Sequence, residues 1–178
     1  MNVYDFDGTI YKGDSGVSFV KFIFLKKPFF IIWHLIKTIK YLILYKMKKI
    51  EFKNMKEYLF SFVKSLDDID KLIDEFVKQN KNKIKQYYKN TKKGDDIILS
   101  ASLDFYLIPL CNAIGISNVI CTKYDVKKGK IIGENCRLQE KIKRFEEAYG
   151  RDAKIENAYG NSKNDVPMLK MAENRIRC

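Results

Sequence analysis

The first ten residues, MNVYDFDGTI, place two carboxylates at the end of a short apolar segment. Asp5 and Asp7 are two residues apart, and Gly8 and Thr9 follow them directly. Carboxylates this close repel each other, and burial at the end of a strand adds to that cost unless a cation compensates for their charge. The pair therefore indicates chemistry that uses a divalent cation, whereas a lone aspartate after a strand is more often part of a turn or a helix cap.

Other polar side chains follow other predicted strands. Ser100 comes after the apolar run at residues 97–99, and Lys141 lies on a predicted helix that precedes the segment IENAYG. Three more polar residues come after that segment: Asn161, Asn164 and Asp165. Ligands of open α/β sheets bind at the carboxyl ends of the strands, so these groups are expected to converge. Carboxylates, a hydroxyl and an ammonium suit phosphoryl chemistry with Mg²⁺, which prefers oxygen ligands.

Strands alternate with helices at the start of the chain and again from residue 94 onward. Short apolar or alternating runs predict strands at residues 2–6, 97–99, 118–126 and 155–160, with a last one near RIRC. Helical periodicity predicts helices at residues 104–114, 138–149 and 166–172, and a hairpin turns at Lys128-Gly129. This alternation predicts a doubly wound, mostly parallel α/β sheet of Rossmann-like type.

The intervening segment, residues 15–93, has a different character. It contains 19 lysines, no arginine and 7 acidic residues, so it carries the whole net charge of +12. Its apolar spacing predicts helices at residues 15–25, 28–45, 51–64 and 67–90. We therefore expect a helical, lysine-rich cap at residues 15–93, inserted into a core made of residues 1–14 and 94–178.

Four motifs in order resemble the haloacid dehalogenase superfamily of phosphatases: DFDGT (5–9), the serine of ILSAS, the downstream lysine and GNSKND (160–165). The resemblance is closest to the phosphoserine-phosphatase-like branch, subfamily IB, whose members carry a helical cap after the first motif. The stretch from SASLDFY to GENC is similar to that branch throughout, including Thr122, Gly129, Gly133 and Cys136. The resemblance covers nearly the whole chain, but in the cap it extends only to topology.

This resemblance implies a role for each catalytic side chain. Asp5 would attack phosphorus to form an aspartyl-phosphate. Asp7 would protonate the leaving alkoxide and then deprotonate the attacking water, and its backbone carbonyl would bind Mg²⁺. Ser100 and Lys141 would hold the transferring phosphoryl oxygens. A dehalogenase is disfavoured, because that reaction has no use for the second aspartate.

The remaining implied roles concern phosphate, metal and substrate. Gly8, Thr9, Ala101 and Asn164 would bind the phosphate, with backbone N–H groups near Gly8 and Ala101 as donors. The implied metal ligands are Asp5, Asp7, Asn161 and Asp165, with Asp165 alternatively orienting Lys141. Asp14 lies where phosphoserine phosphatases place an acid that binds the substrate ammonium.

Each of these residues has an ordinary structural alternative. Ser100 would serve as a helix cap, although its position after a buried strand favours catalysis. Lys141 lies beside Lys143 and Arg144 on a helix where a solvated charge is the usual explanation. Asp14 and Asp165 would each suit a turn or a helix N-cap.

Asn161 departs from the family pattern, which has an aspartate as a direct metal ligand at this position. An amide oxygen also binds Mg²⁺, but the change removes one negative charge. Reduced or altered activity is therefore expected more readily than complete loss, because Asp5 and Asp7 both remain.

The cap composition bears on the substrate. Phosphoserine phosphatases bind the substrate carboxylate with a cap arginine, and residues 15–93 contain none, so phosphoserine is a poor candidate. An anionic phosphate ester, with an amphiphilic one as a further option, fits the cationic cap. Residues 28–45 form the most apolar stretch, flanked by lysines. Packing of its apolar side inside the cap is the preferred interpretation, and contact with an anionic membrane surface is the alternative.

The leading hypothesis is a cytoplasmic Mg²⁺-dependent phosphatase, associated with a membrane if residues 28–45 contact lipid. The four cysteines show no CxxC pair, which fits reduced thiols. One alternative is a binding or regulatory module with weak or no catalysis, as Asn161 would indicate, and the other is a lipid-phosphate phosphatase at the membrane surface. Nucleic-acid binding is not expected, because the lysine-rich segment lacks the arginine that specific readout favours.

Overall fold

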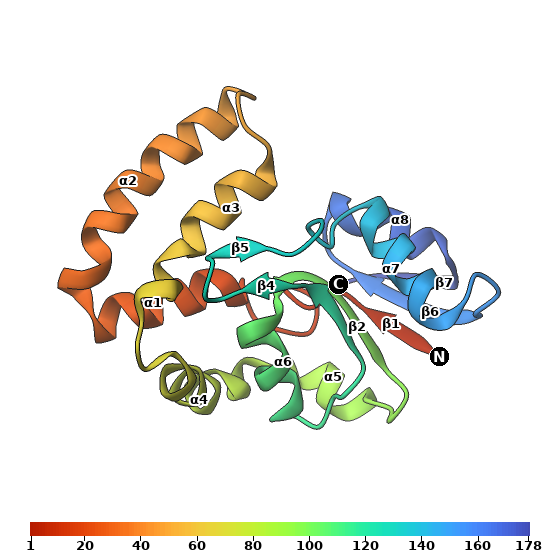
Figure 1. The fold of residues 1–178 in the computed structure, drawn as a ribbon. Helices are drawn as coiled ribbons and strands as arrows, with labels where there is room; N and C mark the ends of the chain where they lie inside the picture. The colour runs from red at the N-terminus through yellow and green to blue at the C-terminus, as the bar shows by residue number, and fades with distance from the viewer.

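A computed structural model describes all 178 residues, with a parallel sheet on one side and a group of helices on the other (Figure 1). Five strands form the sheet in the order β3-β2-β1-β6-β7, and every neighbouring pair is parallel. The strands are β1 (Asn2–Tyr4), β2 (Ile97–Leu103), β3 (Val119–Thr122), β6 (Ile155–Gly160) and β7 (Ala172–Arg177). The prediction of a doubly wound, mostly parallel α/β sheet is confirmed.

Helices cover both faces of this sheet. Side chains alternate between the two faces along each strand, so neighbouring residues of a strand pack against different helices. On one face Val3 packs with Phe145 and Met168, which belong to α7 (Gln139–Tyr149) and α8 (Val166–Lys170). On the other face Tyr4 packs with Leu107 of α6 (Asp104–Asn112). The central strand β1 is therefore buried on both sides, and the residues that follow it emerge at the carboxyl edge of the sheet.

A short hairpin follows β3. It consists of β4 (Tyr124–Asp125) and β5 (Lys130–Ile131), which pair antiparallel. The turn contains Lys128 and Gly129, and Gly129 has a φ of +68°, a backbone conformation that favours glycine. The predicted hairpin is confirmed.

Residues 15–93 contain helices and no strand of the sheet. The α-helices are α1 (Ser15–Lys26), α2 (Pro28–Lys46), α3 (Phe52–Phe60), α4 (Ile69–Asn80) and α5 (Gln86–Thr91). Two 3₁₀ turns, η1 (Ser61–Ser65) and η2 (Lys81–Lys83), connect them. The division of the chain into a core and a cap domain stays a prediction, because one apolar cluster runs from Tyr4 of the sheet to Phe19 and Phe76 of this segment.

Residues 67–90, predicted as one lysine-rich helical stretch, are helical but are divided into α4, η2 and α5. The α-helix ends at Asn80, η2 follows it, and the chain then pairs with the loop that follows β1. Lys12 N donates to the Lys83 carbonyl at 2.9 Å, and Lys85 N donates to the Ile10 carbonyl at 2.8 Å. These hydrogen bonds to a distant loop replace helical ones at this point. The spacing of apolar residues along the segment does not reveal such tertiary contacts.

Aromatic packing attaches the helical segment to the core. The Phe19 ring of α1 lies 5.4 Å from the Tyr106 ring of α6 and 5.2 Å from the Phe76 ring of α4, measured between centroids. All three rings are buried. This contact holds the start of α1 over the carboxyl edge of the sheet, where the polar residues gather.

Candidate active site

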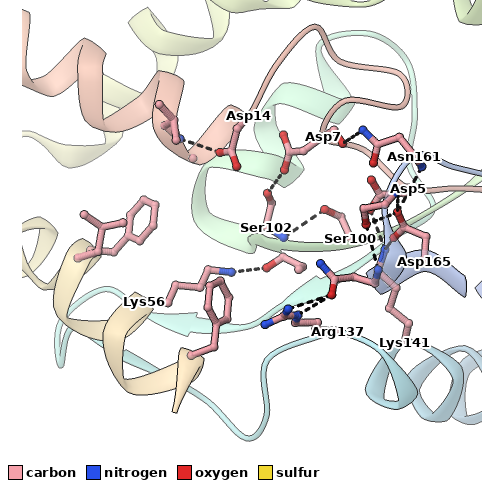
Figure 2. A pocket seen from close by; sticks show the side chains of 18 of the residues that line it. Asp5, Asp7, Asp14, Lys56, Ser100, Ser102, Arg137, Lys141, Asn161 and Asp165 are labelled. Carbon is pink, nitrogen blue, oxygen red and sulfur yellow. Dashed lines mark hydrogen bonds and ion pairs between the residues drawn. The ribbon is translucent and has the colours of Figure 1, made fainter. Parts of the chain in front are cut away.

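The carboxyl ends of β1, β2 and β6 meet at one cleft of about 410 Å³ (Figure 2). Asp5 follows β1, Ser100 lies on β2 and Asn161 follows β6. Nine of the predicted site residues line this cleft: Asp5, Asp7, Asp14, Ser100, Ala101, Lys141, Asn161, Asn164 and Asp165. The structure thus brings together segments that lie more than 150 residues apart in the chain.

A buried ammonium bridges two carboxylates at the floor of the cleft. Lys141 Nζ lies 2.7 Å from Asp5 Oδ1 and 2.7 Å from Asp165 Oδ1. Lys141 is 1% exposed, which rules out the solvated role that its charged neighbours in the sequence suggested. Lys141 lies in the first turn of α7, and its side chain reaches Asp5 at the end of β1, while Lys143 stays exposed.

The pKa values of this triad reflect a balance between burial and charge. Burial raises the pKa of Asp5 to about 6; Lys141 opposes this shift, and the charges of Asp165 and Asp7 add to it. Burial alone would lower the pKa of Lys141, but the two carboxylates outweigh burial and raise it. Burial also acts to raise the pKa of Asp165, yet Lys141 and Ser162 bring it below its ordinary value. The triad therefore holds a charged ammonium between carboxylates.

Asp165 is fully engaged by hydrogen bonds. Its Oδ1 binds Lys141, while its Oδ2 accepts from Ser162 Oγ at 2.7 Å, Ser162 N at 3.0 Å and Asn161 N at 3.3 Å. These contacts match the orienting role expected from the family, since they hold Lys141 in place. Each Asp165 oxygen already accepts a hydrogen bond, so the structure favours the orienting role, and direct binding of a metal by Asp165 stays a prediction.

Asp7 is held by donors from two other segments. Ser15 N donates to Asp7 Oδ1 at 2.6 Å, and the Ser102 hydroxyl donates to Asp7 Oδ2. Burial raises the pKa of Asp7, and the nearby charge of Asp14 raises it further, against the effect of the Ser102 and Ser15 hydrogen bonds. A carboxyl with a raised pKa is a suitable proton donor.

The loop residues Gly8 and Thr9 do not line the cleft. Gly8 N donates to the carbonyls of Tyr11 and Gly13 at 3.0 and 2.9 Å, so this N–H is used within the loop. The Gly8 N–H is therefore not free for phosphate in this structure, and phosphate binding by the backbone around Gly8 stays a prediction. Thr9 is buried, with its hydroxyl 3.4 Å from Asp5 Oδ2, and thus contacts the acid rather than the cleft.

Asp14 and Asn164 each have a local hydrogen-bonding partner. Asp14 is the N-cap of α1 and accepts from Val17 N at 2.8 Å, as the alternative interpretation of this residue anticipated. Asn164 Oδ1 accepts from Arg137 Nη2 at 2.9 Å and from Nε at 3.2 Å. Both side chains also line the cleft.

The side chain of Asn161 packs against the loop that carries Asp7. Its Nδ2 donates to the Asp7 carbonyl at 3.2 Å, and a Cβ at Gly8 would lie 1.8 Å from the same nitrogen. Gly8 has a φ of +76°, so both the backbone and the contact with Asn161 require glycine here.

The oxygens near Asn161 fit a Mg²⁺ ion. The structure holds no cluster of three or more His, Cys, Asp or Glu side chains suited to a metal, so an ion here would need backbone and amide oxygens in addition to the Asp5 carboxylate. Exchanging the oxygen and nitrogen positions of the Asn161 amide would place its oxygen beside the Asp7 carbonyl oxygen. Two such oxygens repel each other unless a cation binds both. With Asp5 nearby, the donor set is made of oxygen alone, as Mg²⁺ prefers.

Three residues of the site were not predicted from the sequence. Ser102 positions Asp7, while Lys56 of α3 and Arg137 bring two further cations to the cleft. Lys56 Nζ donates to the Ala101 carbonyl and, at 3.0 Å, to Asn135 Oδ1. Burial lowers the pKa of Lys56 to about 8, partly offset by Asp7 and Asp14. Ser102, two residues after Ser100 on the same strand, was detectable from the period of two; Lys56 and Arg137 carry no such signal.

Apolar side chains form the wall of the cleft farthest from Asp5. They come from α1 and α3: Val17, Phe52, Met55, Leu59 and Phe60. The Arg137 guanidinium lies over the Phe52 ring, 4.6 Å from its centroid. The cleft therefore has a charged floor at the strand ends and an apolar wall on the side of the helical segment.

Known proteins share this sequence pattern and fold. A family model described as haloacid dehalogenase-like hydrolase matches residues 3–170. Protein CicA of Caulobacter vibrioides is 32% identical over 84 residues, which are 44% of this chain and 38% of that protein. The match thus spans well under half of that relative's length.

Solved structures extend the comparison to nearly the whole chain. A protein with unknown function from Bordetella pertussis Tohama I has a TM-score of 0.77 at 16% identity, covering 96% of this chain and 85% of that one. A substrate-bound phosphoserine phosphatase has a TM-score of 0.57 at 17% identity, covering 96% and 81%. At these identities the likeness shows a shared fold.

Replacement of Lys141 tests the buried triad. Lys141→Met leaves two buried carboxylates without their cation, and we expect the free energy of unfolding to fall by about 3–5 kcal/mol in urea denaturation. Lys143→Met, on the exposed side of the same helix, should change it by no more than about 0.5 kcal/mol. Equal effects of the two substitutions would contradict the role assigned to Lys141.

Proposed function

We propose that this chain, which belongs to the haloacid dehalogenase-like hydrolases, is a Mg²⁺-dependent phosphatase of small phosphate monoesters. One observation carries the proposal: Lys141 holds Asp5 at the strand end, at 2.7 Å, with Asp7 beside it in the same cleft. A positioned carboxylate next to a carboxyl of raised pKa suits nucleophilic attack coupled to proton transfer.

In the first step, an Asp5 oxygen attacks the phosphorus of the bound ester, and the bond from phosphorus to the leaving oxygen breaks. Asp7 donates its proton to that oxygen, so the alcohol leaves as a neutral molecule. The products are an aspartyl-phosphate at Asp5 and a carboxylate at Asp7. Ser102 and Ser15 N keep the Asp7 carboxyl in place during this transfer.

In the second step, water attacks the phosphorus and Asp7 takes the proton of that water. The bond between phosphorus and the Asp5 oxygen breaks, which releases inorganic phosphate and restores the Asp5 carboxylate. Lys141 and the Ser100 hydroxyl, both at the floor of the cleft, would bind the phosphoryl oxygens and offset their charge.

The Asp5 carboxylate, the Asp7 carbonyl and the Asn161 amide oxygen would hold Mg²⁺. When bound, the ion supplies positive charge that offsets the repulsion between the carboxylates and the substrate phosphate. Asp165 contributes by orienting Lys141, because both of its oxygens are engaged.

The cleft favours a substrate with a second anionic group and an apolar part. Lys56 and Arg137 line the cleft together with the apolar wall, so the lack of arginine in residues 15–93 does not leave the substrate without a cation. A lipid-like phosphate ester would place its apolar part against that wall. We also propose a cytoplasmic location, since all four cysteines are unpaired.

The enzyme claim is tested by phosphate release from p-nitrophenyl phosphate. Asp5→Asn should lower kcat at least about 1,000-fold, because it removes the nucleophile, and EDTA should abolish the activity of the unmodified protein until Mg²⁺ is restored. Asp152→Asn, an exposed acid outside the cleft, is the matched control and should retain full activity. Turnover by the unmodified protein no higher than that of Asp5→Asn would leave a binding or regulatory module as the better description.

Asn161→Asp tests the metal site separately from catalysis. The added carboxylate should tighten Mg²⁺ binding about tenfold, since affinity rises with the charge of the ligands. The measurement is the rise of Tm with Mg²⁺ concentration, which reports binding to the folded state. Asn112→Asp, at an exposed position, should leave the Mg²⁺ dependence unchanged. An Asn161→Asp protein with the same dependence would exclude Asn161 as a ligand.

Lys56→Met tests the second anionic group of the substrate. We compare 3-phosphoglycerate with glycerol 3-phosphate, which differ by a carboxylate in place of a hydroxymethyl group. The substitution should lower kcat/KM for the first at least about tenfold more than for the second, because a charge-assisted hydrogen bond is lost. Lys53→Met on the same helix, whose ammonium pairs with Glu134 at 3.1 Å, is the control. The same loss for both esters would show that Lys56 does not bind this group.

A further inference from the structure

Helix α2 lies along the outer side of the helical segment, beside α3 and away from the sheet (Figure 1). Its inner side is partly polar. His34 Nε2 donates to the Leu59 carbonyl at 3.1 Å, Thr38 is buried, and the Tyr41 ring stacks on the Tyr58 ring at 3.6 Å between centroids. The preferred interpretation, in which the apolar side of residues 28–45 packs inside the segment, is therefore wrong.

The outer side of α2 is a stripe of apolar side chains in contact with solvent. Its members recur every three or four residues: Phe29, Ile32, Trp33, Ile36, Ile39, Ile43 and Met47. Phe29 is 91% exposed and Trp33 69% exposed. We name this set the α2 stripe. A 19-residue helix is about 28 Å long, and a soluble monomer rarely exposes a continuous apolar surface of that length unless something binds it.

Lysines border the α2 stripe, and acids are missing from its surroundings in the sequence. Residues 21–50 contain eight lysines and no aspartate or glutamate. Lys37, Lys40 and Lys46 are exposed on α2 itself. Two lysines before the helix are paired, Lys26 with Glu75 and Lys27 with Asp68, which leaves the cations on and after α2 to define the charge of this face.

We infer that the α2 stripe docks on the surface of an anionic lipid bilayer, with its apolar side chains among the acyl chains and its lysines at the headgroups. An apolar face with basic borders is the composition that binds such an interface. A second copy of this chain fits less well, because joining two stripes would bring two sets of lysines together on proteins of net charge +12.

By length and composition alone, α2 also meets the criterion for crossing a membrane. The contacts of its inner side favour a helix that lies in the interface instead. Crossing would separate Tyr41 and His34 from α3, and it would place Lys37 and Lys40 near the middle of the bilayer, where charged side chains are costly. Lying flat keeps those contacts and immerses the stripe alone.

Docking on α2 leaves the cleft open. Helix α3 supplies Phe52, Met55, Lys56 and Leu59 to the cleft, whereas no residue of α2 lines it. The binding experiment therefore does not depend on the proposed phosphatase activity, and failure of either proposal is distinguishable from failure of the other.

Trp33 is the only tryptophan of the chain and lies within the stripe, so its fluorescence reports docking directly. With vesicles of phosphatidylcholine and phosphatidylglycerol, we expect the Trp33 emission to move to shorter wavelength and brominated lipids to quench it. The full-length protein should also sediment with these vesicles. Phosphatidylcholine alone should give much weaker binding, and added salt should weaken the anionic case.

Two multiple variants with matched controls separate charge from apolar contact. The first variant is Lys37→Gln/Lys40→Gln/Lys46→Gln, which should weaken partitioning into the vesicles about 100-fold, since each lysine near an anionic surface contributes about fivefold. Its control is Lys143→Gln/Lys154→Gln/Lys170→Gln, which should leave partitioning unchanged. The second variant is Ile36→Ser/Ile39→Ser, which should weaken partitioning about tenfold per residue. Its control is Ile108→Ser/Ile132→Ser, at exposed positions outside α2, which should leave partitioning unchanged. All five substitutions on α2 are at exposed positions, so unchanged Tm values would exclude unfolding as the cause.

Five outcomes would overturn the inference. They are no spectral shift with anionic vesicles, equal binding to neutral and anionic vesicles, and equal losses in the test and control variants. The fourth is a shift of Trp33 emission that depends on protein concentration without lipid, which would show a second copy as the occupant. Resistance of the membrane-bound protein to alkaline extraction would likewise replace docking with a spanning helix.

Discussion

The site depends on one buried cation. Lys141 is nearly inaccessible to solvent and binds Asp5 and Asp165 at once, each at 2.7 Å. Without it, two carboxylates would face each other in a buried setting, and one of them would have to take up a proton or move into water. The same ammonium therefore serves the fold, by joining α7 to the ends of β1 and β6, and the chemistry, by holding the Asp5 carboxylate in place.

The parallel sheet explains why such a charge cluster forms at this edge. Strands β1, β2 and β6 are neighbours and all point the same way, so their last residues meet at one place. The helices on the two faces bury β1 completely and most of β2, and polar groups gather at the carboxyl edge. Asp7 then receives its hydrogen bonds from Ser15 and Ser102, which come from the helical segment and from β2. The acid is thus positioned from both sides of the cleft.

The helical segment gives the molecule two distinct surfaces. Its α3 side closes the cleft with an apolar wall and brings Lys56 to it, while its α2 side carries the apolar stripe. An anionic, partly apolar substrate and an anionic bilayer have related chemistry, since each offers negative charge beside hydrocarbon. The lysine-rich composition of residues 15–93 therefore has a use on both sides of the segment.

The sequence by itself determined the α/β sheet, the order of its elements and the cluster around Asp5, because hydrophobic periodicity and strand ends are local features. Only the tertiary structure decided which charges are buried. Lys141 and Lys143 look alike in the sequence, yet only Lys141 faces Asp5. It also decided that α2 turns its polar side inward, because stacking on Tyr58 is a contact between helices. Which lysine is buried and which side of α2 faces inward depend on the element that packs opposite. The spacing of residues along one segment does not determine that neighbour.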